Sequence, residues 1–301
     1  MISTDYAAIL ERHQLPAPTT ITPLTPYTVL LDETILLHLS DGPQPVLSKV
    51  ALIERQLLGA GIPVAEVLAL DTSREYVAGD LLIERVPAGV VAGEIWQSLT
   101  RTEQEALSEA LGTIIARVHN LAWPGYGDFD PAQKNFGLHG RWIEALVERI
   151  TALSTALQDG LVLPARLVDG AIIALNDGDS LIETASPPTL IHCALSWDHV
   201  RLQQREGGWQ IAALMGWSGA IVADEAWELA ELWLHRNHLY PDPDCFLGGY
   251  RSLHQPQLDR RARRDLYRLL IHLEGALAAH QASDIFRYAR HEAALLRLLR
   301  K

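Results

Sequence analysis

The stretch TLIHCALSWDHVRL, residues 189–202, brings the most reactive side chains of the chain into a short run. His192, Asp198 and His199 stand there between two apolar runs. An imidazole beside a carboxylate can move protons near neutral pH. The pattern is typical of a catalytic loop between two strands, and these three residues are its candidates for acid–base chemistry.

A metal site or a cysteine nucleophile is a weaker interpretation of the same loop. His192, Cys193, Asp198 and His199 are close in sequence, but successive residues of an extended chain point to opposite sides. No second cluster in the sequence completes a set of four ligands. A lone cysteine beside a histidine is more often a small buried apolar group. We therefore expect no metal site.

The elements that must position this loop fall into two unequal parts. A short helix is expected over residues 1–14. Apolar runs then predict strands over residues 27–32, 34–40, 64–70 and 80–86, with one amphipathic helix over residues 47–60. The pattern predicts an α+β chain with a small β-rich lobe, residues 1–86, crossed by one helix. A larger helical lobe, residues 87–301, follows, and the cleft between the lobes is the expected binding site.

The second part of the chain is mainly helical in its pattern. A helix is expected over residues 102–120, with Thr102 as its N-cap and Glu105 completing a capping box. A strand over residues 209–220 follows the loop. Further helices are expected over residues 141–157, 225–239, 258–279 and 283–299.

Composition excludes several classes of partner and site. The net charge is −12, and the densest basic run, Arg260–Arg264, is flanked by acidic residues, so we expect no nucleic-acid partner. Two cysteines give no disulfide framework, and no apolar run is long enough to cross a membrane. We expect a cytoplasmic protein without a membrane partner, and the sequence leaves the oligomeric state open.

Four segments in order resemble the aminoglycoside phosphotransferase and choline kinase-like family, which has the protein-kinase fold. They are residues 110–121, 190–202, 211–232 and 246–253. The second resembles the catalytic loop His-Gly-Asp-Leu-His-Pro-x-Asn, and the third resembles the metal strand Val-Ile-Asp-Trp-Glu. The resemblance implies a two-lobed protein-kinase-like fold, with ATP and Mg²⁺ as the expected cofactors of an active member.

The chain departs from this family at the positions that do the chemistry. Ala194 stands at the place of the catalytic Asp, and its methyl group can accept no proton. His199 stands at the place of the metal-binding Asn, although Mg²⁺ prefers oxygen ligands. Gly216 stands at the place of the metal-binding Asp and offers no carboxylate.

The N-terminal lobe departs from the family in the same way. The phosphate-covering loop should contain glycine, but residues 22–31 hold two prolines and no glycine. His38 occupies the place of the phosphate-holding Lys or Arg. Glu54 matches the family's ion-pair Glu, and its usual partner is missing.

These departures predict a pseudokinase that binds ATP and Mg²⁺ weakly or not at all. It would act as a binding, scaffolding or regulatory subunit for a small molecule, peptide or protein partner in the cleft. The alternative is an enzyme with relocated chemistry in the cleft, which would use His192, Asp198 and His199. The residues expected to line the cleft are Trp197, Glu54, Glu84, Asp224 and Glu228.

Overall fold

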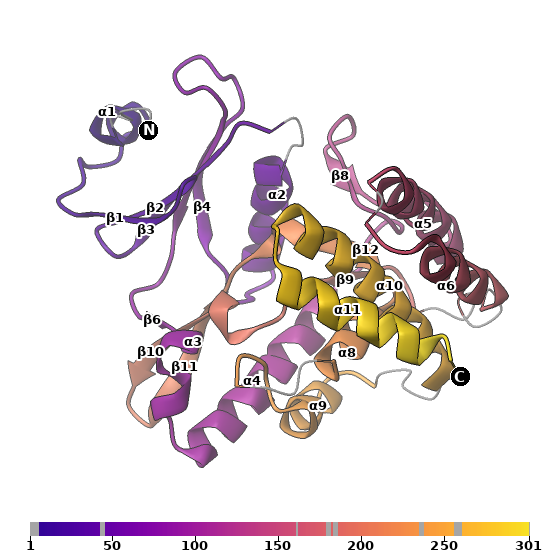
Figure 1. The fold of residues 1–301 in the computed structure, drawn as a ribbon. Helices are drawn as coiled ribbons and strands as arrows, with labels where there is room; N and C mark the ends of the chain where they lie inside the picture. The colour runs from indigo at the N-terminus through magenta and orange to yellow at the C-terminus, as the bar shows by residue number, and fades with distance from the viewer. Residues whose placement is uncertain are drawn as a thin grey trace.

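The N-terminal lobe is an antiparallel sheet with a helix on each face (Figure 1). The computed structural model describes residues 6–42, 46–160, 162–178, 182, 186–234, 238–255 and 261–300. The sheet has five strands in the order β1-β2-β3-β5-β4. The elements of this lobe are α1 (Tyr6–Arg12), β1 (Ile21–Thr25), β2 (Thr28–Leu31), β3 (Ile35–Ser40), α2 (Val46–Gly59), β4 (Glu66–Asp71) and β5 (Asp80–Arg85).

Alternation along the strands decides which helix each side chain meets. Leu81 and Ile83 of β5 pack into the cluster that contains Leu10 of α1. Leu82, between them, packs into the cluster that contains Ile53 of α2. Successive side chains of a strand point to opposite faces, so β5 contributes side chains to a hydrophobic cluster on each face of the sheet.

The C-terminal lobe places a small β-structure among its helices. Strand β10 (Val200–Arg205) lies between β11 (Gly208–Leu214) and β6 (Val90–Val91), while β12 (Ile221–Ala223) pairs with β9 (Thr189–Ile191). A hairpin of β7 (Phe129–Asp130) and β8 (Asn135–Phe136) lies near β12. The helices are α3 (Ala92–Ile95), α4 (Arg101–His119), α5 (Trp142–Asp159), α6 (Ala165–Asp177), α8 (Glu225–Leu232), α9 (Pro243–Arg251), α10 (Arg261–Gln281) and α11 (Ile285–Leu298).

The two lobes share a core, because α2 is buried against the C-terminal lobe. Ile53 and Leu57 of α2 belong to the same buried cluster as Leu111 of α4 and Trp217. Lys49 of α2, itself buried, places its Nζ 2.7 Å from Asp128 Oδ1 beside β7. The helix of the small lobe is therefore fixed to the large lobe by packing and by an ion pair.

The fold class expected from the sequence is confirmed: an α+β, two-lobed, kinase-like architecture. Several boundaries differ. Helix α4 begins two residues earlier than expected, with Thr100 as N-cap and Glu103 closing the capping box. The Thr102–Glu105 assignment is wrong because the chain contains two overlapping Thr-x-x-Glu patterns, and Glu105 pairs with Arg101 instead.

Other helices also differ from their expected extents. Helix α8 ends at Leu232, not at residue 239, and α6 and α9 were not expected as helices. The first helix is described from Tyr6 to Arg12. Residues 1–5 of the helix expected over 1–14, and residues 258–260 of the helix expected over 258–279, lie outside the described part of the chain. In that part, no helix has both the length and the apolar character needed to span a membrane.

Candidate functional site

His192 is fixed by backbone contacts at the end of β9. Its ring is buried, and Nε2 lies 2.7 Å from the carbonyl oxygen of Met215. Burial, and then the neighbouring His199, lower the pKa of His192 to about 3, so the ring is neutral at physiological pH. Such a group orders the loop, and it is poorly suited to take up a proton from a substrate.

Glu228 of α8 holds the backbone of the same loop. Its Oε2 accepts a hydrogen bond from the backbone N–H of His192. Burial raises the pKa of Glu228 to about 7, although bonds from the N–H groups of His192 and Cys193 act in the opposite direction. Cys193 has a positive φ of 61°, at the place where the family's loop has glycine. The carboxyl predicted to line the cleft is therefore buried and positions the loop.

Asp224 is the N-cap of α8 and links this helix to Tyr267 and Arg263 of α10. It accepts a hydrogen bond from the N–H of Ala226, and Tyr267 donates its hydroxyl proton to Oδ2 at 2.6 Å. Arg263 Nε lies 3.5 Å from the same oxygen. Asp224 is 0 % exposed, so it is not open to a ligand.

An imidazole lies at the position that the resemblance aligns with the family's metal-binding Asn. His199 Nδ1 lies 2.6 Å from the carbonyl oxygen of Ala194, which ties the ring across the loop. The opposite side of the ring lies against Gly216, where an added Cβ would come within 2.5 Å of His199 Cδ2. The site thus offers no oxygen pair at the places of the metal-binding Asn and Asp, and its residues do not fit Mg²⁺.

This contact predicts coupling between His199 and Gly216. Gly216→Asp alone should lower the free energy of unfolding by about 1–3 kcal/mol, because the new side chain meets the imidazole. His199→Asn should relieve part of that loss, since it shortens the side chain. Urea unfolding of the two single variants and the double variant measures the coupling. Strictly additive losses would show that the ring does not fill this position.

The N-lobe replaces the expected cation–carboxylate pair with a different arrangement. His38 Nε2 lies 3.0 Å from Glu84 Oε2, and His38 Nδ1 lies 3.1 Å from the hydroxyl of Thr28. Burial together with the neighbouring Glu84 raises the pKa of Glu54 well above its ordinary value. Burial opposes ionisation of Glu84 as well, but bonds from His38 and Glu54 outweigh it and lower the pKa of Glu84.

The expected cleft residues Glu54 and Glu84 are therefore interior groups. They are 2 % and 4 % exposed. In the family a Lys or Arg contacts the ion-pair Glu, whereas here His38 contacts Glu84. His38 thus pairs with Glu84 and not with Glu54. Oε2 of Glu54 and Oε1 of Glu84 are buried and have no hydrogen-bond partner among the described residues.

Apolar side chains occupy the space between the β3 strand and the metal strand. Leu36 of β3, Ala65 and Val86 form a buried cluster against which Leu30 and Met215 pack. In the kinase fold the nucleotide lies between the N-lobe sheet and the catalytic loop. The described side chains in this region pack against one another.

Arg201 closes the same region with its guanidinium. Its Nε donates to the carbonyl oxygen of Pro87 at 2.7 Å, and a terminal nitrogen donates to the carbonyl oxygen of Glu33 at 3.0 Å. One buried side chain thus links the segment between the lobes to the β2–β3 turn.

The placement expected for Trp197 is wrong. The sequence suggested an aromatic side chain at the cleft mouth, but Trp197 is 0 % exposed. Its ring stacks on Trp96 with centroids 3.9 Å apart. The next residue, Asp198, is exposed and lies against Gly93 of α3, while His199 turns toward Ala194. Within the described chain, no hydrogen bond joins Asp198 to His199.

Glu228, which the sequence places among the cleft residues, belongs to a group of carboxyls beside the loop. We call Glu228, Glu231 and Glu274, with Arg149 and Cys193, the carboxyl cluster. Burial, followed by the charges of Glu228 and Glu274, raises the pKa of Glu231 to about 8. Burial and the charges of Glu228 and Glu231 raise the pKa of the Cys193 thiol well above its ordinary value. These effects show that the groups share one poorly hydrated region.

Among the described residues, one carboxyl of the cluster forms an ion pair with a cation. Arg149 Nε lies 2.5 Å from Glu274 Oε1. Glu228 Oε1 and Glu231 Oε2 are buried and have no hydrogen-bond partner among the described residues. No local signal in the sequence could reveal this cluster, because α5, α8 and α10 contribute to it from distant parts of the chain.

The raised pKa of Glu231 predicts a stability that falls as pH rises. The folded protein holds a proton that the unfolded chain releases, so stability decreases between the ordinary value of 4.5 and about 8. Glu231→Gln should be neutral near pH 5 and should stabilise by about 1–3 kcal/mol at pH 8.5. Thermal unfolding across this pH range tests it, with exposed Glu206→Gln as control. Equal pH profiles for wild type and Glu231→Gln would refute the assignment.

Comparison with solved structures agrees with this geometry across almost the entire chain. A thermostable variant of aminoglycoside phosphotransferase APH(4)-Ia, in a ternary complex with AMP-PNP and hygromycin B, matches with a TM-score of 0.72 and 18 % identity over 99 % of this chain and 98 % of that one. The chain has the fold of the aminoglycoside phosphotransferases. A streptomycin–ATP complex of APH(2")-IIa matches with a TM-score of 0.68 and 13 % identity over 99 % and 97 % of the two chains.

The aminoglycoside phosphotransferase fold is thus shown, while activity stays a matter for experiment. No protein-family model matches the chain, and the sequence comparison with curated proteins finds no match. The expectations about ATP, Mg²⁺, partners and the pseudokinase state remain predictions. In the part of the chain that the structure describes, no group of three or more His, Cys, Asp or Glu side chains is placed to hold a metal ion.

Proposed function

We propose that this chain is a pseudokinase that binds a cationic small molecule and transfers no phosphoryl group. The observation that carries the proposal is the imidazole of His199 against Gly216, at the place where the family's two metal ligands would stand. Phosphoryl transfer depends on positioned metal ions that neutralise phosphate charge. Ala194, which offers no acceptor for the proton of a substrate hydroxyl, supports the same conclusion.

The apolar cluster between the lobes further supports the loss of nucleotide binding. Leu36, Val86 and Met215 pack together, and Arg201 links Pro87 to Glu33. We infer that these contacts fill space that a bound nucleotide would need. The alternative of relocated chemistry finds no support in the geometry, because His192, Asp198 and His199 make separate contacts and do not converge.

The carboxyl cluster supports a cation as the ligand. Glu231 is partly exposed and its Oε2 has no partner among the described residues, and such a carboxyl gains free energy when an ammonium group pairs with it. The net charge of −12 attracts cations to the molecule as a whole. The similar structures of APH(4)-Ia and APH(2")-IIa hold hygromycin B and streptomycin respectively.

Two measurements on the same sample test the proposal. Calorimetric titration with hygromycin B, and separately with spermidine, should detect binding without nucleotide, and Glu231→Gln should weaken it about tenfold. Glu206→Gln, on an exposed turn, should leave it unchanged. Incubation with ATP and Mg²⁺ should yield no ADP above background with either compound. ADP production dependent on one of them would overturn the pseudokinase, and absence of binding to both would overturn the cationic ligand.

A further inference from the structure

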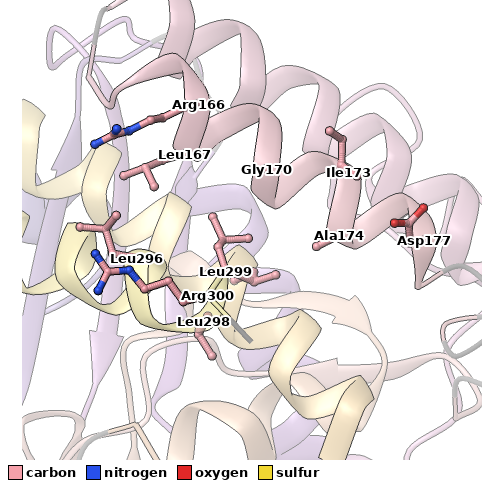
Figure 2. Close-up of a pocket in the computed structure, with 11 residues that line it drawn as sticks. Arg166, Leu167, Gly170, Ile173, Ala174, Asp177, Leu296, Leu298, Leu299 and Arg300 are labelled. Carbon is pink, nitrogen blue, oxygen red and sulfur yellow. The ribbon is translucent and has the colours of Figure 1, made fainter.

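A surface groove lies far from the loop, between α6 and the end of α11 (Figure 2). It has a volume of about 610 Å³. Its floor is apolar and includes Leu167, Leu296 and Leu299. Gly170 of α6 faces the side chain of Leu299, which a Cβ at that position would meet at 3.4 Å. Ile173 stands at its edge and is 59 % exposed.

The rim of the groove carries opposite charges at its two ends. Arg166 lies at one end of α6 and Asp177 at the other, as Figure 2 shows. They are separated by three turns of helix, about 16 Å along its axis. Neither forms an ion pair with any of the residues that the structure describes, so both charges are available at the surface.

The order of these residues along α6 is complementary to itself. Arg166, Gly170, Ile173 and Asp177 lie on one stripe of the helix. The stripe is symmetric in spacing about its midpoint. Arg166 and Asp177 lie equally far from that midpoint on its two sides, and so do Gly170 and Ile173. When two such helices pack antiparallel about a two-fold axis, each arginine meets an aspartate, and each exposed Ile173 comes to lie opposite Gly170 of the other copy, which has no side chain of its own. An interface of this kind presents the same patch from both subunits.

We propose that α6 and the end of α11 form the interface of a homodimer, with a second copy of this chain as the occupant of the groove. The pairing combines charge complementarity at both ends of the helix with the burial of an exposed apolar side chain, Ile173, near its middle. Ile173, which is exposed in the single chain, becomes buried in the dimer. Arg300, at the same end as Arg166, adds positive charge beside the incoming Asp177.

Sedimentation velocity over a wide range of protein concentration tests this surface. The wild type should show a concentration-dependent monomer–dimer equilibrium. Arg166→Asp and Asp177→Arg should each raise the dimer Kd about tenfold or more, because each places like charges opposite one another at both ends. The double variant should restore the wild-type Kd, since the pairs are then only reversed.

Substitutions at two exposed apolar residues distinguish association through this groove from non-specific hydrophobic association. Ile173→Glu should abolish the dimer, whereas Phe286→Ser, which alters a side chain 87 % exposed at the start of α11, should not change it. Unfolding midpoints of all variants establish that they fold. A wild type that stays monomeric would overturn the proposal. So would a double charge variant that fails to restore association, or a dimer lost in Phe286→Ser and retained in Ile173→Glu.

Discussion

Asp224→Ala is expected to lower the free energy of unfolding by about 3–5 kcal/mol, the loss typical of breaking a buried ion pair from one side. The carboxylate is fully buried and contacts Arg263, which is 2 % exposed. Without this carboxylate, the positive charge of the buried Arg263 guanidinium has lost its negatively charged partner Asp224. It also removes the acceptor for the Tyr267 hydroxyl and the N-cap of α8.

Asp242→Ala is the matched control for this variant. Asp242 caps α9 in the same manner, accepting from the N–H groups of Asp244 and Cys245, but it is exposed. Its removal should cost about 1 kcal/mol, the ordinary loss of an N-cap. Urea unfolding compares the two. Equal losses would mean that Asp224 acts as a cap only, and that the buried pair with Arg263 stabilises nothing further.

Trp197→Ala should destabilise the fold by about 3–5 kcal/mol, because it removes a fully buried indole from the core. The ring packs face to face with Trp96, and the backbone N–H of Trp197 donates to the carbonyl oxygen of Leu239. The variant should therefore unfold at a clearly lower urea concentration.

Trp209→Ala serves as the control, because this tryptophan of β11 is only half-buried. Its loss should cost less than half as much. If Trp197 stacked on a ligand as the sequence suggested, Trp197→Ala would instead leave stability unchanged and weaken ligand binding. That outcome would contradict the buried stack.

Most of the N-terminal lobe could be predicted from the sequence because its signals are local. Apolar runs, the Asp32-Glu33 turn and the stripe of α2 each lie within a few neighbouring residues. The boundary of α4 could not be fixed, since two Thr-x-x-Glu patterns overlap within six residues. The choice between them depends on how the helix packs in the folded protein, which a short sequence motif does not reveal.

The sequence positions that depart from the family's motifs could be located, but the contacts made by the residues that stand there could not. Motif spacing alone located Ala194 and Gly216. The contact between His38 and Glu84 joins residues 46 apart, and Trp96 meets Trp197 across a much longer separation. Such pairings follow from tertiary structure, so the burial of Trp197 and the partner of Glu84 could not be inferred.

The central claim is most directly tested by the unfolding midpoint in the presence of ATP, with and without Mg²⁺. A ligand that binds the folded state stabilises it, by about 2.7 kcal/mol at a hundred times its Kd. With His199 at the metal position and Leu36, Val86 and Met215 packed together, we predict the same midpoint in all conditions. A rise in midpoint that grows with ATP concentration and requires Mg²⁺ would contradict the account.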